Sequence, residues 1–165
     1  MLIKRSNLVL SLMSALMIGF SYPPFHGFLS WIAFIPLIDI WYRENPNKSF
    51  FYSYLFGFFS NFIILYWIGL NSGADKTTVL VSLIAALLYL SLFPGFFGLL
   101  ISFLLKKNDK ALFLIPFAWT SMELIRSFGP LGFPWINLSL TQSSFLPMIQ
   151  IIDIFGNEII GFIIL

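Results

Sequence analysis

The chain has no cysteine, a single histidine and few charged residues, and each absence excludes a class of site. Without cysteine there is no disulfide, no thiolate metal site and no cysteine nucleophile within these residues. One histidine, His26, does not make a histidine metal cluster, and no glycine-rich phosphate-binding loop is present. We therefore expect neither a metal nor a cofactor.

Charge of either sign is also scarce, since Asp, Glu, Lys and Arg make up 10% of the residues and the net charge is +2. So small an excess does not indicate a nucleic-acid partner. Hydrophobic residues make up 59% of the chain, and the mean hydropathy is +0.92. An ordinary soluble domain is about half apolar and about a quarter charged. The composition therefore indicates a membrane protein.

Six apolar segments predict an all-α fold: a polytopic membrane helix bundle of about five complete transmembrane helices plus the start of a sixth. They run approximately over residues 7–21, 25–41, 50–70, 78–105, 111–125 and 145–165. Pro36, Pro94 and Pro116 lie inside three of them. Because neighbouring helices compensate for a lost backbone hydrogen bond in the membrane, we expect these prolines to kink their helices rather than break them.

The cations are distributed unevenly over the loops, and this predicts the orientation. With the amino terminus inside, seven of the nine Lys and Arg residues fall on the cytoplasmic side. The seven are Lys4, Arg5, Arg43, Lys48, Lys106, Lys107 and Lys110. An excess of cations in cytoplasmic loops is usual for membrane proteins. We therefore expect a cytoplasmic amino terminus, with the loop of residues 127–144 on the outer face.

The last segment is apolar from Ile159 to Leu165 and has no polar flank beyond it, while Asp153 and Glu158 interrupt its earlier part. A membrane protein rarely ends with its last helix half way across the bilayer. We therefore expect residues 1–165 to be an amino-terminal transmembrane domain truncated within its last helix. A truncated product, a disrupted gene or an excerpt of a longer chain would each explain it.

The most unusual polar residues are Glu123 and Arg126, near the end of the fifth segment. Residues spaced i, i+3 share one face of a helix and can pair. Ionisable residues within membranes face the protein interior or a wet cavity and often mark function. The alternative is a structural pair that extends to the interface and fixes the depth of the helix. The sequence leaves both interpretations open.

A stiff loop follows this pair, with two glycines and a proline in residues 129–132. Phe133, Pro134 and Trp135 then place two aromatic rings around a proline on the outer face. A tryptophan there is ordinarily an interfacial anchor, and the same holds for Trp67 at the end of the third segment. Beside Arg126, however, the loop could form a lipid-headgroup site, with the cation for phosphate and the aromatics against acyl chains.

Tyr66-Trp67, the helix with Trp119, Glu123 and Arg126, and the Gly-Phe-Pro-Trp run of residues 132–135 ending in Thr141-Gln142 occur together in this chain. In that combination they resemble bacterial apolipoprotein N-acyltransferase. The turn of residues 20–23 and residues 152–156 also match its amino-terminal membrane region, so the resemblance covers essentially the whole chain. Where the family often has Gly-Tyr after the Pro-Trp, this chain has Ser139-Leu140.

The resemblance implies transfer of an acyl chain from a phospholipid to the α-amino group of a diacylated lipoprotein, in the bacterial inner membrane. The family does this with a periplasmic nitrilase-type domain whose Glu-Lys-Cys triad takes the acyl group as a thioester. Neither that domain nor its cysteine is in this sequence, so none of its residues is expected to be catalytic. By resemblance the substrate-cleft or docking candidates are Trp67, Glu123, Arg126, Phe133, Pro134 and Trp135.

Three hypotheses follow from these observations. The leading one is the membrane part of an apolipoprotein N-acyltransferase, inactive alone, whose partners are phospholipid and diacylated lipoprotein. The second is half of a split enzyme that needs a separate nitrilase-type polypeptide docked on the outer loops. The third is a non-enzymatic membrane binding or transport module. Few polar residues within the membrane, mainly Asn61, are available for a transport path.

Overall fold

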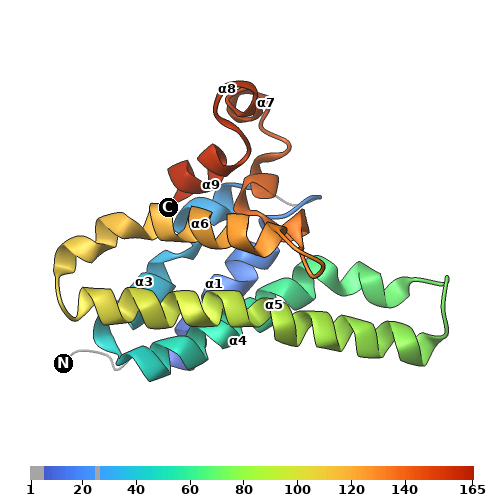
Figure 1. Cartoon of the computed structure of the whole chain (residues 1–165), viewed down its shortest axis with the longest axis horizontal. Helices are drawn as coiled ribbons and strands as arrows, with labels where there is room; N and C mark the ends of the chain where they lie inside the picture. The colour runs from blue at the N-terminus through green and yellow to red at the C-terminus, as the bar shows by residue number, and fades with distance from the viewer. Residues whose placement is uncertain (1–5, 25–26) are drawn as a thin grey trace.

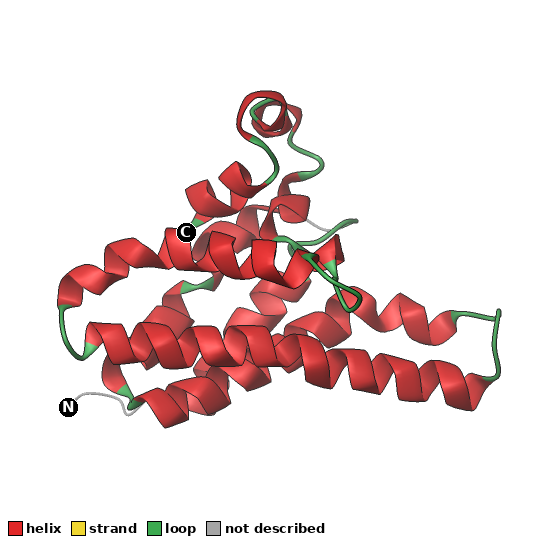
Figure 2. Cartoon of the chain, in the orientation of Figure 1, coloured by secondary structure: helices red, strands yellow, loops and turns green. Residues whose placement is uncertain are grey.

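The computed structural model describes residues 6–24 and 27–165 of the chain. All regular structure within those two ranges is helical, in α-helices joined by short 3-10 helices (Figure 2). The predicted all-α fold class is therefore confirmed for the described part. The cations Lys4 and Arg5 and the histidine His26, which entered the sequence analysis, lie outside it.

The helices follow one another with short connections. The longer α-helices are α1 (Asn7–Gly19), α3 (Ile35–Arg43), α4 (Pro46–Leu65), α5 (Lys76–Leu105) and α6 (Ile115–Ser127). The short α-helices are α2 (Ser30–Ala33), α7 (Leu146–Ile149), α8 (Ile152–Phe155) and α9 (Glu158–Ile164). The 3-10 helices are η1 (Gly27–Leu29), η2 (Tyr66–Leu70), η3 (Asp109–Leu114), η4 (Pro134–Ile136) and η5 (Leu138–Gln142).

Helices α4 and α5 form a long antiparallel hairpin that runs along the longest axis of the molecule (Figure 1). Together with η2, α4 makes a helical stretch of 25 residues, and α5 has 30 residues. Within the described residues these are the two helices long and apolar enough to cross a membrane. The other helices are shorter, so the five-span arrangement stays a prediction.

Small side chains hold α4 and α5 close together. Buried on the two helices are Ser49, Ser53, Gly57, Ser60, Ser91, Gly95, Gly98 and Ser102. At Gly98 an added Cβ would meet the Ser53 side chain and lie 2.9 Å from the carbonyl oxygen of Ser49. Close backbone approach through small residues is the usual way that membrane helices pack. Pro94 lies inside α5, as predicted, and its ring faces Gly57.

The other two prolines do not kink a helix, and the prediction for them was wrong. Pro36 lies in the first turn of α3, and the helical segment is interrupted just before it, at Phe34. Pro116 lies in the first turn of α6, after the 3-10 turns of η3. In a first turn the N–H group that proline lacks would have no partner within the helix, so proline begins helices readily.

The predicted sixth helix is also wrong, because residues 145–165 form three short helices, α7, α8 and α9. Pro147 occupies the first turn of α7, and Gly156 ends α8 with a φ of 80°. Glycine adopts this left-handed conformation without steric penalty and commonly terminates helices. As a result α7 and α8 stand away from the other helices as an arm, while α9 returns to lie beside α6 (Figure 1).

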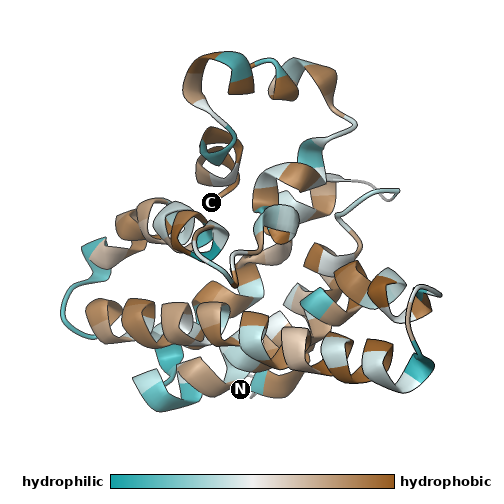
Figure 3. Cartoon of the chain, turned by 45° about the vertical axis from the view of Figure 1, so that its right-hand side comes forward, coloured by the Kyte–Doolittle hydropathy of each residue, from teal (hydrophilic) through white to brown (hydrophobic). Residues whose placement is uncertain are grey.

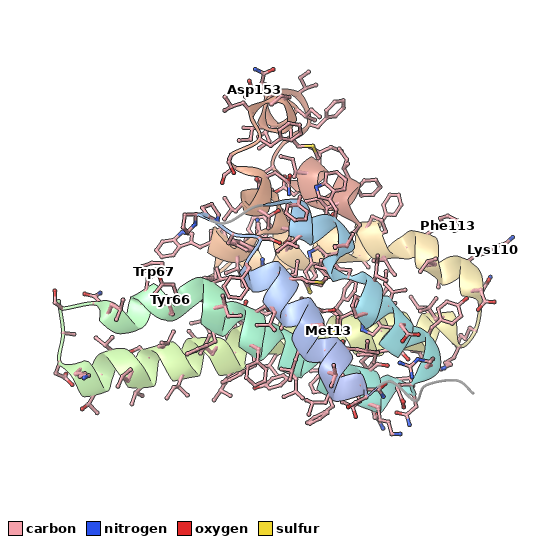
Figure 4. The ribbon with its side chains drawn as sticks, turned by 180° about the vertical axis from the view of Figure 1, so that it is seen from behind. Met13, Tyr66, Trp67, Lys110, Phe113 and Asp153 are labelled. Carbon is pink, nitrogen blue, oxygen red and sulfur yellow. The ribbon has the colours of Figure 1, made fainter. Side chains whose placement is uncertain are left out.

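Polar residues collect in the connections at the ends of the long helices, whose shafts are mostly apolar (Figure 3). Lys110 and Phe113 lie at one end of the long axis, and Tyr66 and Trp67 lie toward the other (Figure 4). The lysine-rich connection between α5 and η3 therefore lies far from the aromatic end of α4, while the orientation in a membrane stays a prediction.

Candidate functional site

Three of the aromatic candidates from the sequence lie together in space. The rings of Trp67 and Trp135 stack with their centroids 5.9 Å apart, although the residues come from η2 and η4. The Phe133 ring lies 5.5 Å from that of Trp135. Trp67 and Trp135 are about half exposed, at 48% and 58%. The cluster is therefore partly open to its surroundings and is not a core element.

The two tryptophans form one wall of a groove of about 700 Å³. Its lining residues are Gly19, Phe20, Tyr22, Pro23, Pro24, Phe62, Ile63, Ile64, Tyr66, Trp67, Trp135, Leu140 and Ser143. They come from the end of α1 and the turn after it, from the end of α4 with η2, and from the loop beyond α6. Most are apolar or aromatic, so the groove suits a hydrocarbon chain better than a charged ligand.

Glu123 and Arg126 lie beneath this loop and are not part of the groove lining. Their side chains are each 3% exposed, and the Arg126 Nη2 lies 3.7 Å from the Glu123 Oε1. On α6 the buried positions are Ile115, Trp119, Glu123 and Arg126, spaced as one helix face. The pair therefore faces the protein interior, and the interpretation in which it extends to the membrane interface does not describe this structure.

Both ionisable residues hold the loop in place through hydrogen bonds. The Glu123 Oε1 accepts from the backbone N–H of Leu138 at 2.7 Å, and the Arg126 Nη2 donates to Asn137 Oδ1 at 2.8 Å. The backbone N–H of Phe133 donates to the carbonyl oxygen of Arg126 at 2.8 Å. Hydrogen bonds to charged groups are stronger than neutral ones, so α6 fixes the position of the aromatic loop.

Other anchors of the loop were missed by the sequence analysis. The Tyr22 hydroxyl donates to the carbonyl oxygens of Ile136, at 2.7 Å, and Asn137, at 3.1 Å. The sequence analysis used the turn of residues 20–23 only for the family resemblance and did not single out Asn137. The available signal was an amide residue directly after the apolar run of residues 130–136, since an amide needs a partner when it is buried.

A second polar connection joins the far end of the loop to the start of α2. The Gln142 amide donates to the Gly27 carbonyl oxygen and to the Ser30 hydroxyl, both at 2.9 Å. The Thr141 hydroxyl donates to the Leu138 carbonyl oxygen at 2.7 Å. A side chain at Gly27 would collide with the backbone of Thr141, so this contact requires glycine. The loop is therefore anchored at both ends.

The structure thus divides the six candidate residues into two groups. Trp67, Phe133 and Trp135 make the aromatic cluster beside the groove, and Pro134 begins the 3-10 turn that presents Trp135. Glu123 and Arg126 hold the loop from below. Direct contact of any of the six with a substrate stays a prediction.

Comparison with known proteins agrees with the resemblance noted from the sequence. Residues 14–165 match the family described as the apolipoprotein N-acyltransferase N-terminal domain. An apolipoprotein N-acyltransferase of Geobacter metallireducens is 33% identical over 98% of this chain and 32% of its own length. Those of Coxiella burnetii and Methylococcus capsulatus are 29% and 27% identical, each over 82% of this chain.

The chain spans about a third of the length of these curated relatives, since the matches cover 32%, 30% and 28% of them. Within that span the family match includes α6, the loop of residues 128–145 and both tryptophans of the groove. The chain therefore belongs to the apolipoprotein N-acyltransferase family, and its match is to the family's amino-terminal domain.

Proposed function

We propose that this chain is the membrane part of an apolipoprotein N-acyltransferase. Such an enzyme moves an acyl chain from a phospholipid to the terminal amine of a diacylated lipoprotein. The chain would be inactive alone, because it has no cysteine to form the thioester. The observation that carries the proposal is the family match, taken together with an apolar groove walled by two stacked tryptophans.

In this proposal the groove between α1, α4 and the loop takes an acyl chain. Phospholipid and diacylated lipoprotein both carry such chains, and an apolar groove open at its side can admit them from the bilayer. The Trp67 and Trp135 rings supply rigid contact area with little rotamer freedom to lose. Glu123 and Arg126 act as positioning residues, since they hold the loop and do not line the groove.

We further propose a multi-pass protein of the bacterial inner membrane with a cytoplasmic amino terminus. The loop of Phe133, Pro134 and Trp135 would then face the periplasm, where a nitrilase-type domain could meet a lipid held in the groove. The uneven distribution of cations over the loops supports this orientation.

A chimera tests the proposal directly. This chain would be joined to the remaining two-thirds of the Geobacter metallireducens relative as a fusion, and in a parallel experiment the two parts would be co-expressed as separate polypeptides. Acyl transfer from phospholipid to a diacylated lipopeptide would then be measured in proteoliposomes. Activity of the fusion supports the proposal, and activity of the co-expressed pair supports the split arrangement. The absence of transfer in both the folded fusion and the folded pair would contradict both hypotheses.

In an active chimera, Trp135→Ala should reduce transfer about tenfold or more, because it removes one wall of the groove and a stacked aromatic pair. Phe113→Ala is the matched control, since Phe113 is 76% exposed and lies at the other end of the molecule. An equal loss of acyl transfer in both variants would show that the effect is common to exposed aromatic residues, and it would contradict a specific role for the groove.

Arg126→Ala should lower acyl transfer more than it lowers the amount of inserted protein, because the loop loses its bond to Asn137. A positioning role predicts a raised KM for phospholipid and partial rescue by Arg126→Lys, which retains one cationic donor. Activity and folded protein that fall in parallel would indicate a purely structural pair.

A further inference from the structure

A small cavity of about 30 Å³ lies beside the Glu123–Arg126 pair and shares Tyr22 and Ile64 with the groove of the tryptophans. Its apolar lining comes from α1, α4, α5 and the loop, and the polar side chains around it are Tyr22, Ser60, Asn61, Glu123 and Arg126, with the indole of Trp119. Asn61 is 5% exposed, so it is shielded from the surroundings. The cavity is therefore polar on one side and lined mainly by buried side chains.

Two buried donors beside this cavity make no hydrogen bond of good geometry to the residues that the structure describes. They are the Arg126 Nε and the Trp119 Nε1, and both residues line the cavity. The Trp119 indole lies near the Glu123 carboxylate, whereas the Arg126 Nε has no such neighbour. The other tryptophan of the core, Trp41, is different, because its Nε1 donates to the Ser53 hydroxyl at 2.7 Å. Buried N–H groups are nearly always paired with protein or with ordered water.

The size and chemistry of the cavity suit water and exclude larger polar ligands. A cavity needs roughly 10–15 Å³ to hold one water molecule, which also needs about two to four polar partners. At about 30 Å³ this cavity has room for one or two waters and none for a phosphate or a headgroup. Arg126 and Trp119 offer donors, while the Glu123 carboxylate and the Asn61 amide offer acceptors.

We propose that this cavity is a binding site for one or two water molecules that hydrate the buried Glu123–Arg126 pair. Water there accepts hydrogen bonds from the unpartnered donors and donates to Asn61 or Glu123. This gives a role to Asn61, the polar residue that the sequence placed in the third apolar segment. The proposal does not depend on acyl transfer and holds for the chain as it exists.

Radiolytic labelling in ¹⁸O-labelled water tests the site, because hydroxyl radicals made from a bound water oxidise the side chains next to it. We expect the label on Trp119, which is 6% exposed, and none on Trp41, which is 1% exposed and does not line the cavity. Trp135, at 58% exposure, is the positive control. Trp119 as unlabelled as Trp41, with Trp135 labelled, would overturn the proposal.

Asn61→Leu then locates the water. Leucine removes one polar partner and fills part of the cavity, so the label on Trp119 should fall to the level of Trp41. Ser60→Ala is the matched control, since the Ser60 hydroxyl already donates to the carbonyl oxygens of Phe56 and Gly57. In the Ser60→Ala variant, the label on Trp119 should therefore remain. Unchanged labelling in folded Asn61→Leu protein would place the water elsewhere and contradict the proposal.

Discussion

At the scale of single residues, the contacts of Glu123 and Arg126 explain why the buried face of α6 carries two charged side chains. Each is buried and each makes a hydrogen bond to the loop of residues 133–142. A buried ion pair adds little net stability, because desolvation offsets the attraction between its charges. Removing one partner is different, since it leaves the other charge buried and uncompensated.

Glu123→Gln should therefore destabilise the protein by about 3–5 kcal/mol, the usual range for breaking a buried pair. The double variant Glu123→Gln with Arg126→Met should recover part of this loss, because no uncompensated charge remains. Thermal unfolding of the purified chain in detergent measures both. A double variant whose loss equals the sum of the single losses would show that the residues act independently.

The sequence predicted the residue types of the site better than their roles. The spacing of Glu123 and Arg126 correctly placed them on one face of a helix, and the aromatic residues of the loop and of η2 do meet. Burial could not be predicted, because a residue near the end of an apolar segment can point either inward or to the interface. Tyr22 and Ile136 are 114 positions apart, so no local pattern indicates their hydrogen bond.

At the scale of elements, the contact between α4 and α5 depends on small residues in register.

The predicted third and fourth segments correspond to α4 with η2 and to α5, because uninterrupted apolar runs strongly favour helices. The second and sixth segments were predicted poorly. Hydropathy alone does not distinguish a continuous helix from short helices separated by proline in a first turn or by a glycine of positive φ.

Gly98→Ala should destabilise the hairpin by about 1–3 kcal/mol, the usual range for overpacking. The new methyl group would collide with Ser53 and press on the backbone of Ser49, which cannot move aside easily. Gly95→Ala on the same helix is the control, because its Cβ would lie 3.1 Å from the edge of the Phe50 ring, which can rotate. Greater or equal loss in the control, measured by thermal unfolding, would contradict this account.

At the scale of the whole molecule, the hairpin is longer than a membrane is thick. The 30 residues of α5 extend about 45 Å at about 1.5 Å per residue, whereas the hydrocarbon core of a bilayer is about 30 Å thick. In the proposed orientation the end with η2 and the loop of residues 71–75 therefore projects beyond the hydrocarbon core. Trp67 lies near this end, where the groove would open close to the membrane surface (Figure 4).

Because the chain has no cysteine, a single introduced cysteine can report the orientation in the membrane, and no native cysteine has to be replaced first. Ser72→Cys should react with a membrane-impermeant maleimide in intact spheroplasts, because the loop between η2 and α5 is exposed and predicted to be outside. Lys110→Cys, at the opposite end, should react only after the membrane is permeabilised. The parent chain serves as the unlabelled control. The reverse pattern would invert the proposed orientation.

The contacts that hold the loop have a consequence for how members of the family can differ. Glu123, Tyr22 and the Arg126 carbonyl bind main-chain groups of the loop, whereas Asn137 and Gln142 contribute side chains. A side chain of the loop that lines the groove can therefore change while the hydrogen bonds to the loop main chain stay the same. Proline at position 133 or 138 would remove the backbone N–H that bonds to the Arg126 carbonyl oxygen or to Glu123. If the groove takes an acyl chain as proposed, a substitution at position 135 would change the groove wall without a change in the helices below.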